Sequence, residues 1–395
     1  MTLFENTERA FIHKSKSELY KTYLLFTIFS YPLFVRISGQ LIVFLLKIGF
    51  PIKGLLKRTV FEQFCAGQQE KDSIKVVESL YNFKVKSYMH YASEGQKTSE
   101  GMEESLKKIL ETIKLSQNNE ALPFTVFKST ALGPARLFEK QTEGVALSAE
   151  EQLEWEQALA RINRCCDYAQ ELNVRLLIDA EESWLQGAID QIALTLMKKY
   201  NQGAQPLIYT TMQMYRNDRL PYLKMLIDEA KSANFQIGIK LVRGAYLEKE
   251  NQRAIERGYP SPLCPTKEAT DENFNQGLYL ILNHLDHCEL FLGSHSEDST
   301  QRLVDWMKTH QIPANSPRIW FSQLYGMADF LSFNLADLGY QVVKYVPYGP
   351  LKEVIPYLIR RAEENSAVQG QSPRELTLIK RELKRRREVK ADGSL

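Results

Sequence analysis

The feature that most constrains the fold is an eightfold alternation between short apolar runs and longer segments of helical periodicity. Between the runs, apolar residues recur at the three- and four-residue spacing of an amphipathic helix, as in 148–172 and 217–233. Repeated eight times, this pattern predicts a parallel α/β architecture, and eight units favour a closed (βα)8 barrel over an open sheet. The predicted strands are 85–92, 122–130, 174–180, 206–215, 235–246, 288–296, 318–326 and 341–349.

The barrel prediction divides the 395-residue chain into three parts. Residues 1–74 are an N-terminal helical arm, 75–370 the barrel, and 371–395 a C-terminal tail with a strongly basic run. The arm contains two uncharged runs, 24–35 and 37–46, each well short of the ~20 apolar residues that span a bilayer. The arm fits either packed helices or helices lying in a membrane surface. The tail fits either a solvated helix or a segment attracted to anionic lipid.

Charge and cysteine usage exclude several classes of function. The formal net charge of +2 gives no general attraction to nucleic acid, so no nucleic-acid partner is expected. The five cysteines are scattered and odd in number, which favours a reducing compartment over a disulfide framework. No cluster has metal-ligand spacing, so no metal is expected. The chain also lacks G-x-G-x-x-G, Walker A, H-E-x-x-H and G-x-S-x-G, so a dinucleotide cofactor would have to bind without a Rossmann fingerprint.

Polar side chains stand at the predicted carboxyl ends of the strands, where barrel enzymes carry their active sites. They are Lys128, Asp179, Gln213, Lys240, Arg243, Tyr246, His295, Gln323 and Tyr345. The set is largely cationic, which predicts a site for anionic groups such as a phosphate-bearing cofactor and a carboxylate substrate. The adjacent pair Arg360 and Arg361 fits the same site if the last helix lies over the barrel mouth. From the residues alone, a Schiff-base aldolase or lyase using Lys128 and a non-enzymatic barrel scaffold both stay open.

A set of ordered motifs resembles the proline dehydrogenase family over roughly residues 60–366. The motifs are FKSTAL, LIDAE, LVRGAYLEKE, PTKEATD, GSHS, QLYGM, YVPYGP and YLIRRAEEN. The short chain and the PTKEAT segment look more like the monofunctional, eukaryote-like branch than the long bifunctional proline utilisation proteins. The resemblance implies a distorted (βα)8 barrel that holds non-covalent FAD. It also implies oxidation of L-proline to Δ1-pyrroline-5-carboxylate by hydride transfer from C5 to flavin N5, with a membrane quinone as electron acceptor.

Matching the motifs residue by residue implies a substrate site. Its residues are Lys128, Asp179, Tyr246, Leu324, Tyr345, Tyr357, Arg360, Arg361 and Glu364. Lys128, Arg360 and Arg361 correspond to the family's clamp on the proline carboxylate, and the tyrosines and Leu324 wall the ring. Tyr345 resembles the tyrosine near ring C4 that favours proline over 4-hydroxyproline. Asp179 is either catalytic or only an ion-pair partner of neighbouring cations.

The match also implies a site for FAD. Its residues are Gln213, Lys240, Arg243, Gly244, Ala245, Thr266, Ser294, His295, Ser296 and Gln323. Gln213 matches a residue at the isoalloxazine edge, and the 243–245 segment would approach the pyrophosphate, with Gly244 allowing close approach of the backbone. Lys240 departs from the arginine that many relatives carry near flavin N5. The lysine keeps the positive charge but loses the forked donor geometry, which puts the N5 contact in doubt.

The sequence also gives an expectation about location. No Arg- and Ser-rich, acid-poor leader is visible at the start of the chain, which favours a bacterial cytoplasmic protein over a mitochondrial one. A quinone acceptor would place such a protein on the inner face of the cytoplasmic membrane, in peripheral contact with it.

Overall fold

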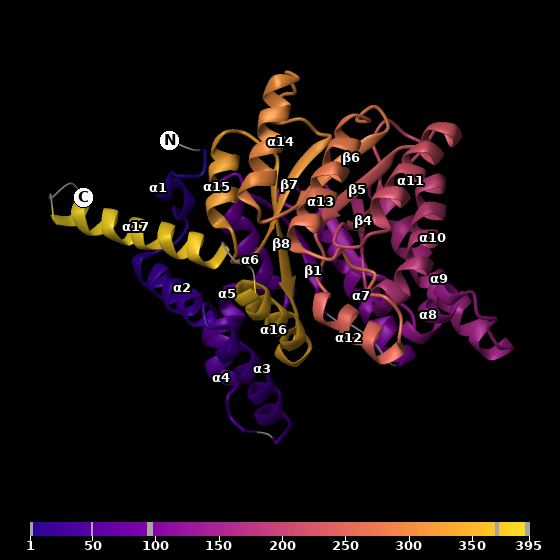
Figure 1. The fold of residues 1–395 in the computed structure, drawn as a ribbon, viewed down its shortest axis with the longest axis horizontal. Coiled ribbons are helices and arrows are strands. Elements are labelled where there is room, and N and C mark those ends of the chain that lie inside the picture. The colour runs from indigo at the N-terminus through magenta and orange to yellow at the C-terminus, as the bar shows by residue number, and fades with distance from the viewer. Residues whose placement is uncertain (1–2, 49, 93–97, 368–370, 392–395) are drawn as a thin grey trace. The chain divides into compact units, whose positions relative to one another are not determined.

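The structure is a computed structural model that describes residues 3–48, 50–92, 98–367 and 371–391. Eight strands pair in chain order, and the order closes on itself as a barrel, with parallel neighbours (Figure 1). All eight predicted strands are confirmed within their predicted ranges. They are β1 (Lys86–Tyr91), β2 (Phe124–Lys128), β3 (Arg175–Asp179), β4 (Ile208–Gln213), β5 (Ile237–Val242), β6 (Cys288–Gly293), β7 (Ile319–Leu324) and β8 (Val342–Tyr348).

The strands form because their residues are apolar on both faces. Every residue of β2, β4 and β8 is buried, as is typical of parallel strands that face helices on one side and a filled interior on the other. Phe124 on β2 meets Phe291 on β6 and Trp320 on β7 edge to face, with ring centroids 5.1 and 4.9 Å apart. Because β2 is not a neighbour of β6 or β7, these contacts run through the interior of the barrel. The barrel is therefore a packed core at this level, not a pore.

The predicted helices are also present, and two further α-helices and a short 3-10 helix, η2, accompany them. The helices from the first strand onward are α7 (Ser99–Ser116), η2 (Ser129–Ala131), α8 (Ala135–Glu143), α9 (Ala149–Glu171), α10 (Ser183–Tyr200), α11 (Arg219–Ala233), α12 (Leu247–Arg257), α13 (Lys267–Leu282), α14 (Glu297–Thr309), α15 (Asp329–Asp337), α16 (Leu351–Ala367) and α17 (Gln371–Ala391). α8 and α12 were not predicted. α9 begins where Ser148 and Glu151 form a reciprocal capping box, which satisfies two backbone N–H groups.

The chain divides into two compact units. One comprises Met1–Ser87, His295–Asn315 and Phe321–Leu395, and is called the first unit below. The other, the second unit, comprises Tyr88–Ser294 and Ser316–Trp320. The predicted site residues are therefore described in two groups, one in each unit.

The N-terminal segment of the first unit is built mainly of helices. Its elements are α1 (Thr7–Ala10), α2 (Lys16–Phe29), α3 (Pro32–Lys47), α4 (Lys53–Leu56), the π-helix η1 (Lys57–Phe61), α5 (Glu62–Phe64) and α6 (Glu70–Tyr81). The amide of Gln63 donates to the carbonyl of Gly326 in the QLYGM motif at 2.6 Å. Gly326 has φ +76°, and a Cβ there would stand 1.8 Å from the backbone oxygen of Gln63. Glycine is required because only glycine has neither that atom nor the strain of this conformation.

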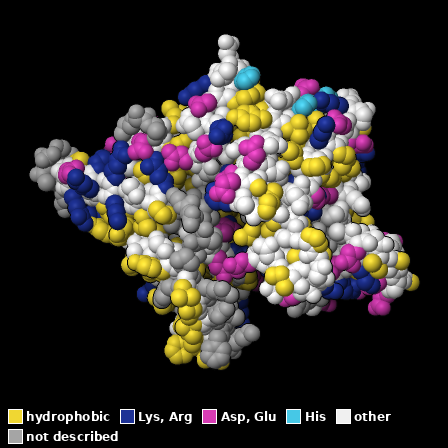
Figure 2. All heavy atoms as spheres, in the orientation of Figure 1, with side chains coloured by type: hydrophobic (Ala, Val, Ile, Leu, Met, Phe, Trp, Pro, Cys, Tyr) yellow, Lys and Arg dark blue, Asp and Glu magenta, His cyan; other side chains and the backbone are white. Residues whose placement is uncertain are grey.

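The basic run of the C-terminus lies in α17, beside the N-terminal helices. Arg374 pairs with Glu5 at 2.6 Å and with Glu297 at 2.9 Å, and Arg381 also pairs with Glu5. Arg386 donates to the carbonyls of Phe11 and Lys14. Figure 2 shows the dark-blue side chains gathered over α17, the yellow helix at the left of Figure 1. Part of this positive charge is thus neutralised within the first unit.

No helix among the described residues is both long enough and apolar enough to cross a bilayer.

Candidate active site

Four predicted site residues of the second unit form two pairs, each between strand ends that are not neighbours in the barrel. Lys128 ends β2 and donates to the Tyr246 hydroxyl at 2.9 Å. Lys240 on β5 pairs with Asp179, the last residue of β3, at 2.5 Å. All four side chains are buried. Burial opposes the charged carboxylate of Asp179, but the neighbouring cations, Lys240 above all, outweigh it and hold the pKa of Asp179 below its usual value. Asp179 thus neutralises the charge of Lys240, whereas the hydrogen bond of Lys128 leads to a neutral phenol.

A buried carboxyl that the sequence analysis missed lies beside Lys128. Glu181 follows Asp179 by two residues, and its carboxylate accepts from the backbone N–H and the hydroxyl of Thr130, at 2.9 and 2.5 Å. Gln213 donates to the Glu181 carbonyl at 2.7 Å. Burial raises the pKa of Glu181 to about 7, although the charge of Lys128 and the Thr130 hydrogen bonds act in the opposite direction. Glu181 therefore ties together the ends of β2, β3 and β4. Its only sequence signal was a second acidic residue after a buried strand.

The segment after β5 combines positive charge with accessible backbone. Arg243 is half-buried, donates to Asp271 at 2.6 Å and to Ser294 at 3.0 Å, and lies 4.3 Å from the Phe274 ring centroid. Gly244 has φ +146°, and a Cβ there would come within 2.4 Å of the Tyr215 ring. The Ala245 N–H faces the amide oxygen of Gln213 at 3.3 Å.

This donor set fits a phosphate-bearing cofactor. A guanidinium group, a serine hydroxyl and a half-buried backbone in a glycine conformation are the groups that bind pyrophosphate in proteins. Two other predicted cofactor residues, Thr266 and Ser296, are also helix N-caps. The hydroxyl of Thr266 caps α13 by accepting from Ala269, and that of Ser296 caps α14 by accepting from Ser299.

In the first unit, α16 carries a group of aromatic and charged side chains. Tyr357 on α16 lies against Tyr345 on β8, with ring centroids 6.3 Å apart. The Arg361 guanidinium lies 5.0 Å from the Tyr357 centroid and pairs with Glu364 one turn later. Among the described residues, the Tyr357 hydroxyl and the Arg361 Nε are buried polar atoms that make no hydrogen bond. Because a buried donor without an acceptor is costly, these two atoms mark a place where a ligand can accept.

The helix spacing explains how the arginine pair is presented. Arg361 is 6% exposed, whereas Arg360 is only half-buried, because adjacent positions on a helix point roughly 100° apart. Asn365 is buried and donates to the Arg361 carbonyl at 2.7 Å, which stabilises the helical turn that carries Arg361. The prediction that both arginines point to one anion stays a prediction. The structure describes Arg361 as the more enclosed of the two.

The remaining predicted residues of the first unit lie at the end of β7. The Leu324 N–H donates to Nε2 of His295 at 3.0 Å, which requires that this nitrogen carry no proton. Gln323 accepts from the Ser332 hydroxyl on α15 at 2.8 Å. The imidazole and amide are thus held in fixed orientations by neighbouring backbone and side chains.

An ion-pair network that the sequence did not reveal supports this strand end. Lys344 on β8 is wholly buried and pairs with Asp329, the first residue of α15, at 2.9 Å. Its ammonium also donates to the carbonyl of Met327 at 2.6 Å. His13 and Lys14 of the arm approach the same Asp329 carboxylate at 3.3 and 3.5 Å. The network fixes the loop that follows Leu324, so the arm is part of the support of the predicted site.

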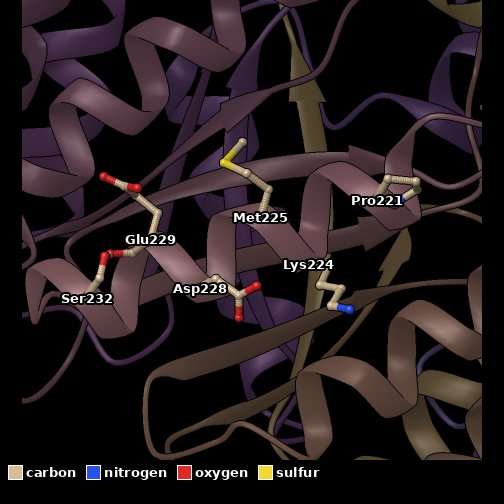
Figure 3. Close-up of a pocket in the computed structure, with 6 residues that line it drawn as sticks. All are labelled: Pro221, Lys224, Met225, Asp228, Glu229 and Ser232. Carbon is tan, nitrogen blue, oxygen red and sulfur yellow. The ribbon is translucent and has the colours of Figure 1, made fainter.

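A separate hollow on the surface contains none of the predicted residues. It is lined by Pro221, Lys224, Met225, Asp228, Glu229 and Ser232, all on α11 (Figure 3). The lining side chains all come from this one helix. We therefore do not assign a site there.

A family model and individual relatives both match the proline dehydrogenase family. The family model described as "Proline dehydrogenase" matches residues 73–374. The chain is 31% identical to proline dehydrogenase 1, mitochondrial, of Dictyostelium discoideum, over 96% of this chain and 74% of that protein. It is 32% identical to the hydroxyproline dehydrogenase of Bos taurus, over 95% of this chain and 92% of that one.

Solved structures show the fold. A crystal structure of proline utilization A (PutA) from Bdellovibrio bacteriovorus superposes with a TM-score of 0.71 at 18% identity. The match covers 91% of this chain but only 38% of the PutA chain. The likeness therefore concerns the (βα)8 barrel with its flanking helices, and not the PutA protein as a whole.

The expectation of a bacterial cytoplasmic protein is wrong. Similar proteins from Dictyostelium discoideum, Homo sapiens (40% identical over 60% of this chain) and Arabidopsis thaliana are named mitochondrial proline dehydrogenases. The expectation rested on the lack of a visible leader. The names of these relatives overturn that expectation.

These findings exclude the scaffold and Schiff-base lyase alternatives. An eight-stranded parallel barrel, polar residues at its strand ends, and a family match over most of the chain agree with one another. The chain belongs to the proline dehydrogenase family and is an oxidoreductase.

Proposed function

We propose that this chain oxidises L-proline to Δ1-pyrroline-5-carboxylate with FAD, and that the electrons pass to a membrane quinone. The observation that carries the proposal is the group on α16, where buried Arg361 and Tyr357 atoms lack acceptors next to the Tyr345 ring. A carboxylate would satisfy the guanidinium, and the aromatic faces suit a small saturated ring. L-Proline has both parts.

The carboxylate is proposed to bind Arg361 together with Arg360 and Lys128. Arg361 already pairs with Glu364, so a bound substrate shares or replaces an existing carboxylate partner. Charge-assisted hydrogen bonds to one carboxylate fix both the position and the orientation of the ring, which brings C5 into line for reaction.

FAD is proposed as the cofactor because the donor set after β5 suits its pyrophosphate. Arg243, Ser294 and the 244–245 backbone would hold that group, and Lys240 and Gln213 would lie toward the flavin. When bound, FAD supplies the acceptor for the hydride that leaves proline C5. Lys240 keeps its position through Asp179.

The protein's own charges bear on the protonation of the substrate. Hydride can leave C5 only when the ring nitrogen has a free electron pair, so the amine must be neutral. Positive charge near the nitrogen disfavours the ammonium form and lowers the pKa of the amine. We propose that Lys128 and Arg361 have this second effect besides holding the carboxylate. In the overall reaction proline loses two electrons and two protons, and the quinone gains the same number.

Hydroxyproline is the competing substrate, because one relative is a hydroxyproline dehydrogenase. Buried Tyr345, stacked on Tyr357, supports proline if its ring packs against ring C4, where 4-hydroxyproline carries the added hydroxyl. The test measures kcat/KM for L-proline and trans-4-hydroxy-L-proline with a water-soluble electron acceptor. We expect a preference for proline of at least about tenfold, and a smaller preference in Tyr345→Ser than in Tyr345→Phe. Equal kcat/KM values in the unaltered protein would contradict the substrate assignment.

A further inference from the structure

An apolar cavity lies inside the first unit, on the far side of α16 from the arginine pair. Its volume is about 70 Å³, several times the ~10–15 Å³ that one water molecule needs on the same measure. It is formed by α2, α3, α4, η1 and α16. The lining residues are Ile28, Phe29, Val35, Ser38, Gly39, Ile42, Leu56, Val60, Ile355, Leu358, Ile359 and Ala362. The one hydroxyl among them, on Ser38, is used by the Val35 carbonyl. The cavity thus offers no hydrogen bond and suits a hydrocarbon.

The α16 helix separates this cavity from the predicted substrate site. Ile355, Leu358, Ile359 and Ala362 recur at three- and four-residue spacing and face the cavity. Tyr357, Arg361 and Glu364 also follow one another at three- or four-residue spacing, and so share a different face of the same helix. An α-helix with side chains is about 10 Å across. A ligand in the cavity would therefore lie within about one helix diameter of the proposed site of proline oxidation.

The α3 helix is apolar on its outer side as well. Val35, Gly39 and Ile42 line the cavity, while Leu33, Ile37 and Leu41 are 72%, 55% and 50% exposed. The exposed apolar surface continues through Tyr31, Ile48, Phe50 and Leu55. Figure 2 shows yellow side chains over α3 and α4 at the lower end of the view. An apolar surface of this kind, exposed beside a helix face that is already packed, favours a further apolar partner.

Charge identifies the kind of partner. From residue 19 to residue 61 the sequence has no Asp or Glu. It has six basic residues in the same stretch, namely Lys21, Arg36, Lys47, Lys53, Lys57 and Arg58. Apolar side chains flanked by basic residues alone are complementary to a bilayer surface that contains anionic phospholipid.

We propose that α2, α3 and α4 dock on an anionic bilayer, and that the cavity receives part of the isoprenoid chain of the lipid quinone dissolved there. The inference rests on the proposed function, because it assigns the place where the quinone binds. The quinone is favoured over a phospholipid acyl chain because the cavity wall is α16 itself. A quinone accepts electrons, so a position one helix diameter from the site of proline oxidation serves its function. An acyl chain accepts no electrons and gains nothing from that position.

The chain offers a matched pair of variants for the test. A Cβ at Gly39 would meet only Ile359, at an ordinary contact distance of 3.5 Å, so the rest of a leucine side chain enters the cavity. A Cβ at Gly54, on the nearby α4, meets nothing within 4 Å. Gly39→Leu therefore fills the cavity, and Gly54→Leu adds the same side chain beside it. Val60→Phe fills the cavity from η1 and serves if Gly39→Leu does not fold.

The first measurement is proline oxidation in vesicles of phosphatidylcholine and phosphatidylglycerol. It compares kcat/KM for a long-chain quinone with kcat/KM for the same quinone without its chain. In Gly39→Leu we expect this ratio to fall roughly tenfold, the effect of leaving about two methylene groups unburied. The ratio should be unchanged in Gly54→Leu. An unchanged ratio in both Gly39→Leu and Val60→Phe would overturn the proposal.

The second measurement does not depend on turnover. A photoactivatable long-chain azidoquinone in the same vesicles should label peptides of α3, η1 or α16, and Gly39→Leu should abolish that labelling. Labelling elsewhere only would overturn the proposal. So would a Gly39→Leu protein that binds vesicles less but keeps its preference for long-chain quinone, since the cavity would then hold an acyl chain. Failure of the proposed function looks different: proline would not be oxidised even with a water-soluble acceptor.

Discussion

Glu375 on α17 gives the sharpest prediction about how the arm and the last helix support the site. Its carboxylate accepts from the backbone N–H of Ala328 at 3.2 Å, at the start of α15. The side chain is buried close to the Asp329–Lys344 pair. Burial, together with the negative charge of Asp329, raises the pKa of Glu375 from 4.5 to about 8, despite the Ala328 hydrogen bond and the nearby lysines.

The raised pKa makes stability depend on pH in a definite direction. The folded protein binds this proton more tightly than the unfolded chain does. The resulting stabilisation is complete below about pH 4.5 and is lost as the pH rises through about 8. Each unit of pKa is worth about 1.4 kcal/mol, so the shift of about 3.5 units corresponds to ~5 kcal/mol in full. Roughly 3 kcal/mol of this is lost by pH 7.

Glu375→Gln removes the titration but keeps an oxygen that can accept from Ala328. We expect the variant to be more stable than the unaltered protein by about 1 kcal/mol at pH 5 and about 3 kcal/mol at pH 7. The assay is urea denaturation of the purified protein at pH 5, 6, 7 and 8. The matched control is Glu388→Gln, an exposed position on the same helix, which should change stability by less than about 0.5 kcal/mol at every pH. A Glu375→Gln effect that does not grow with pH would refute the reasoning.

Three further substitutions test other parts of the account. Arg361→Met should raise the KM for proline on the order of 10- to 100-fold while flavin content is unchanged, because a charge-assisted hydrogen bond is lost; a near-normal KM would remove the carboxylate role. Asp329→Asn should destabilise the protein by about 3–5 kcal/mol in thermal unfolding, because it leaves Lys344 buried without its carboxylate. Adding Lys344→Met should restore much of that loss, and no restoration would argue against a buried-charge penalty. Gly326→Ala should lower the free energy of unfolding by at least about 1–3 kcal/mol, since the new Cβ would collide with the Gln63 backbone. It should also make the arm sensitive to limited proteolysis. Resistance equal to that of the unaltered protein would contradict the contact.

The barrel could be predicted because its strands are buried on both faces. Runs such as 174–180 and 288–292 are short and rich in buried apolar residues, and the helices between runs carry an amphipathic spacing, so the period changes visibly along the chain. α8 and α12 were missed for physical reasons. α8 follows Gly133 and Pro134, which indicate a turn, and α12 is short and mostly charged, with little apolar periodicity.

The site could be predicted in part because a parallel barrel collects its strand ends. Lys128, Asp179 and Lys240 follow from that rule, and the structure pairs the last two. Partners distant in sequence do not follow from any local pattern. The pairing of Arg374 with Glu5 joins the two ends of the chain to each other. The approach of His13 to Asp329 and the contact of Gln63 with Gly326 join the N-terminal arm to segments that follow β7. Glu181 was missed because its partner, Thr130, is distant in the sequence and no local pattern announces the contact.

The central claim is that this barrel oxidises L-proline with a bound flavin. The most direct test is the visible absorption spectrum of the purified protein, recorded without oxygen before and after addition of L-proline, with o-aminobenzaldehyde used afterwards to trap the product. The account predicts oxidised-flavin absorption bands that bleach with proline, and a trapped pyrroline-5-carboxylate adduct in equal amount. Flavin bands that proline leaves unchanged, or a protein that stays colourless after incubation with FAD, would contradict it.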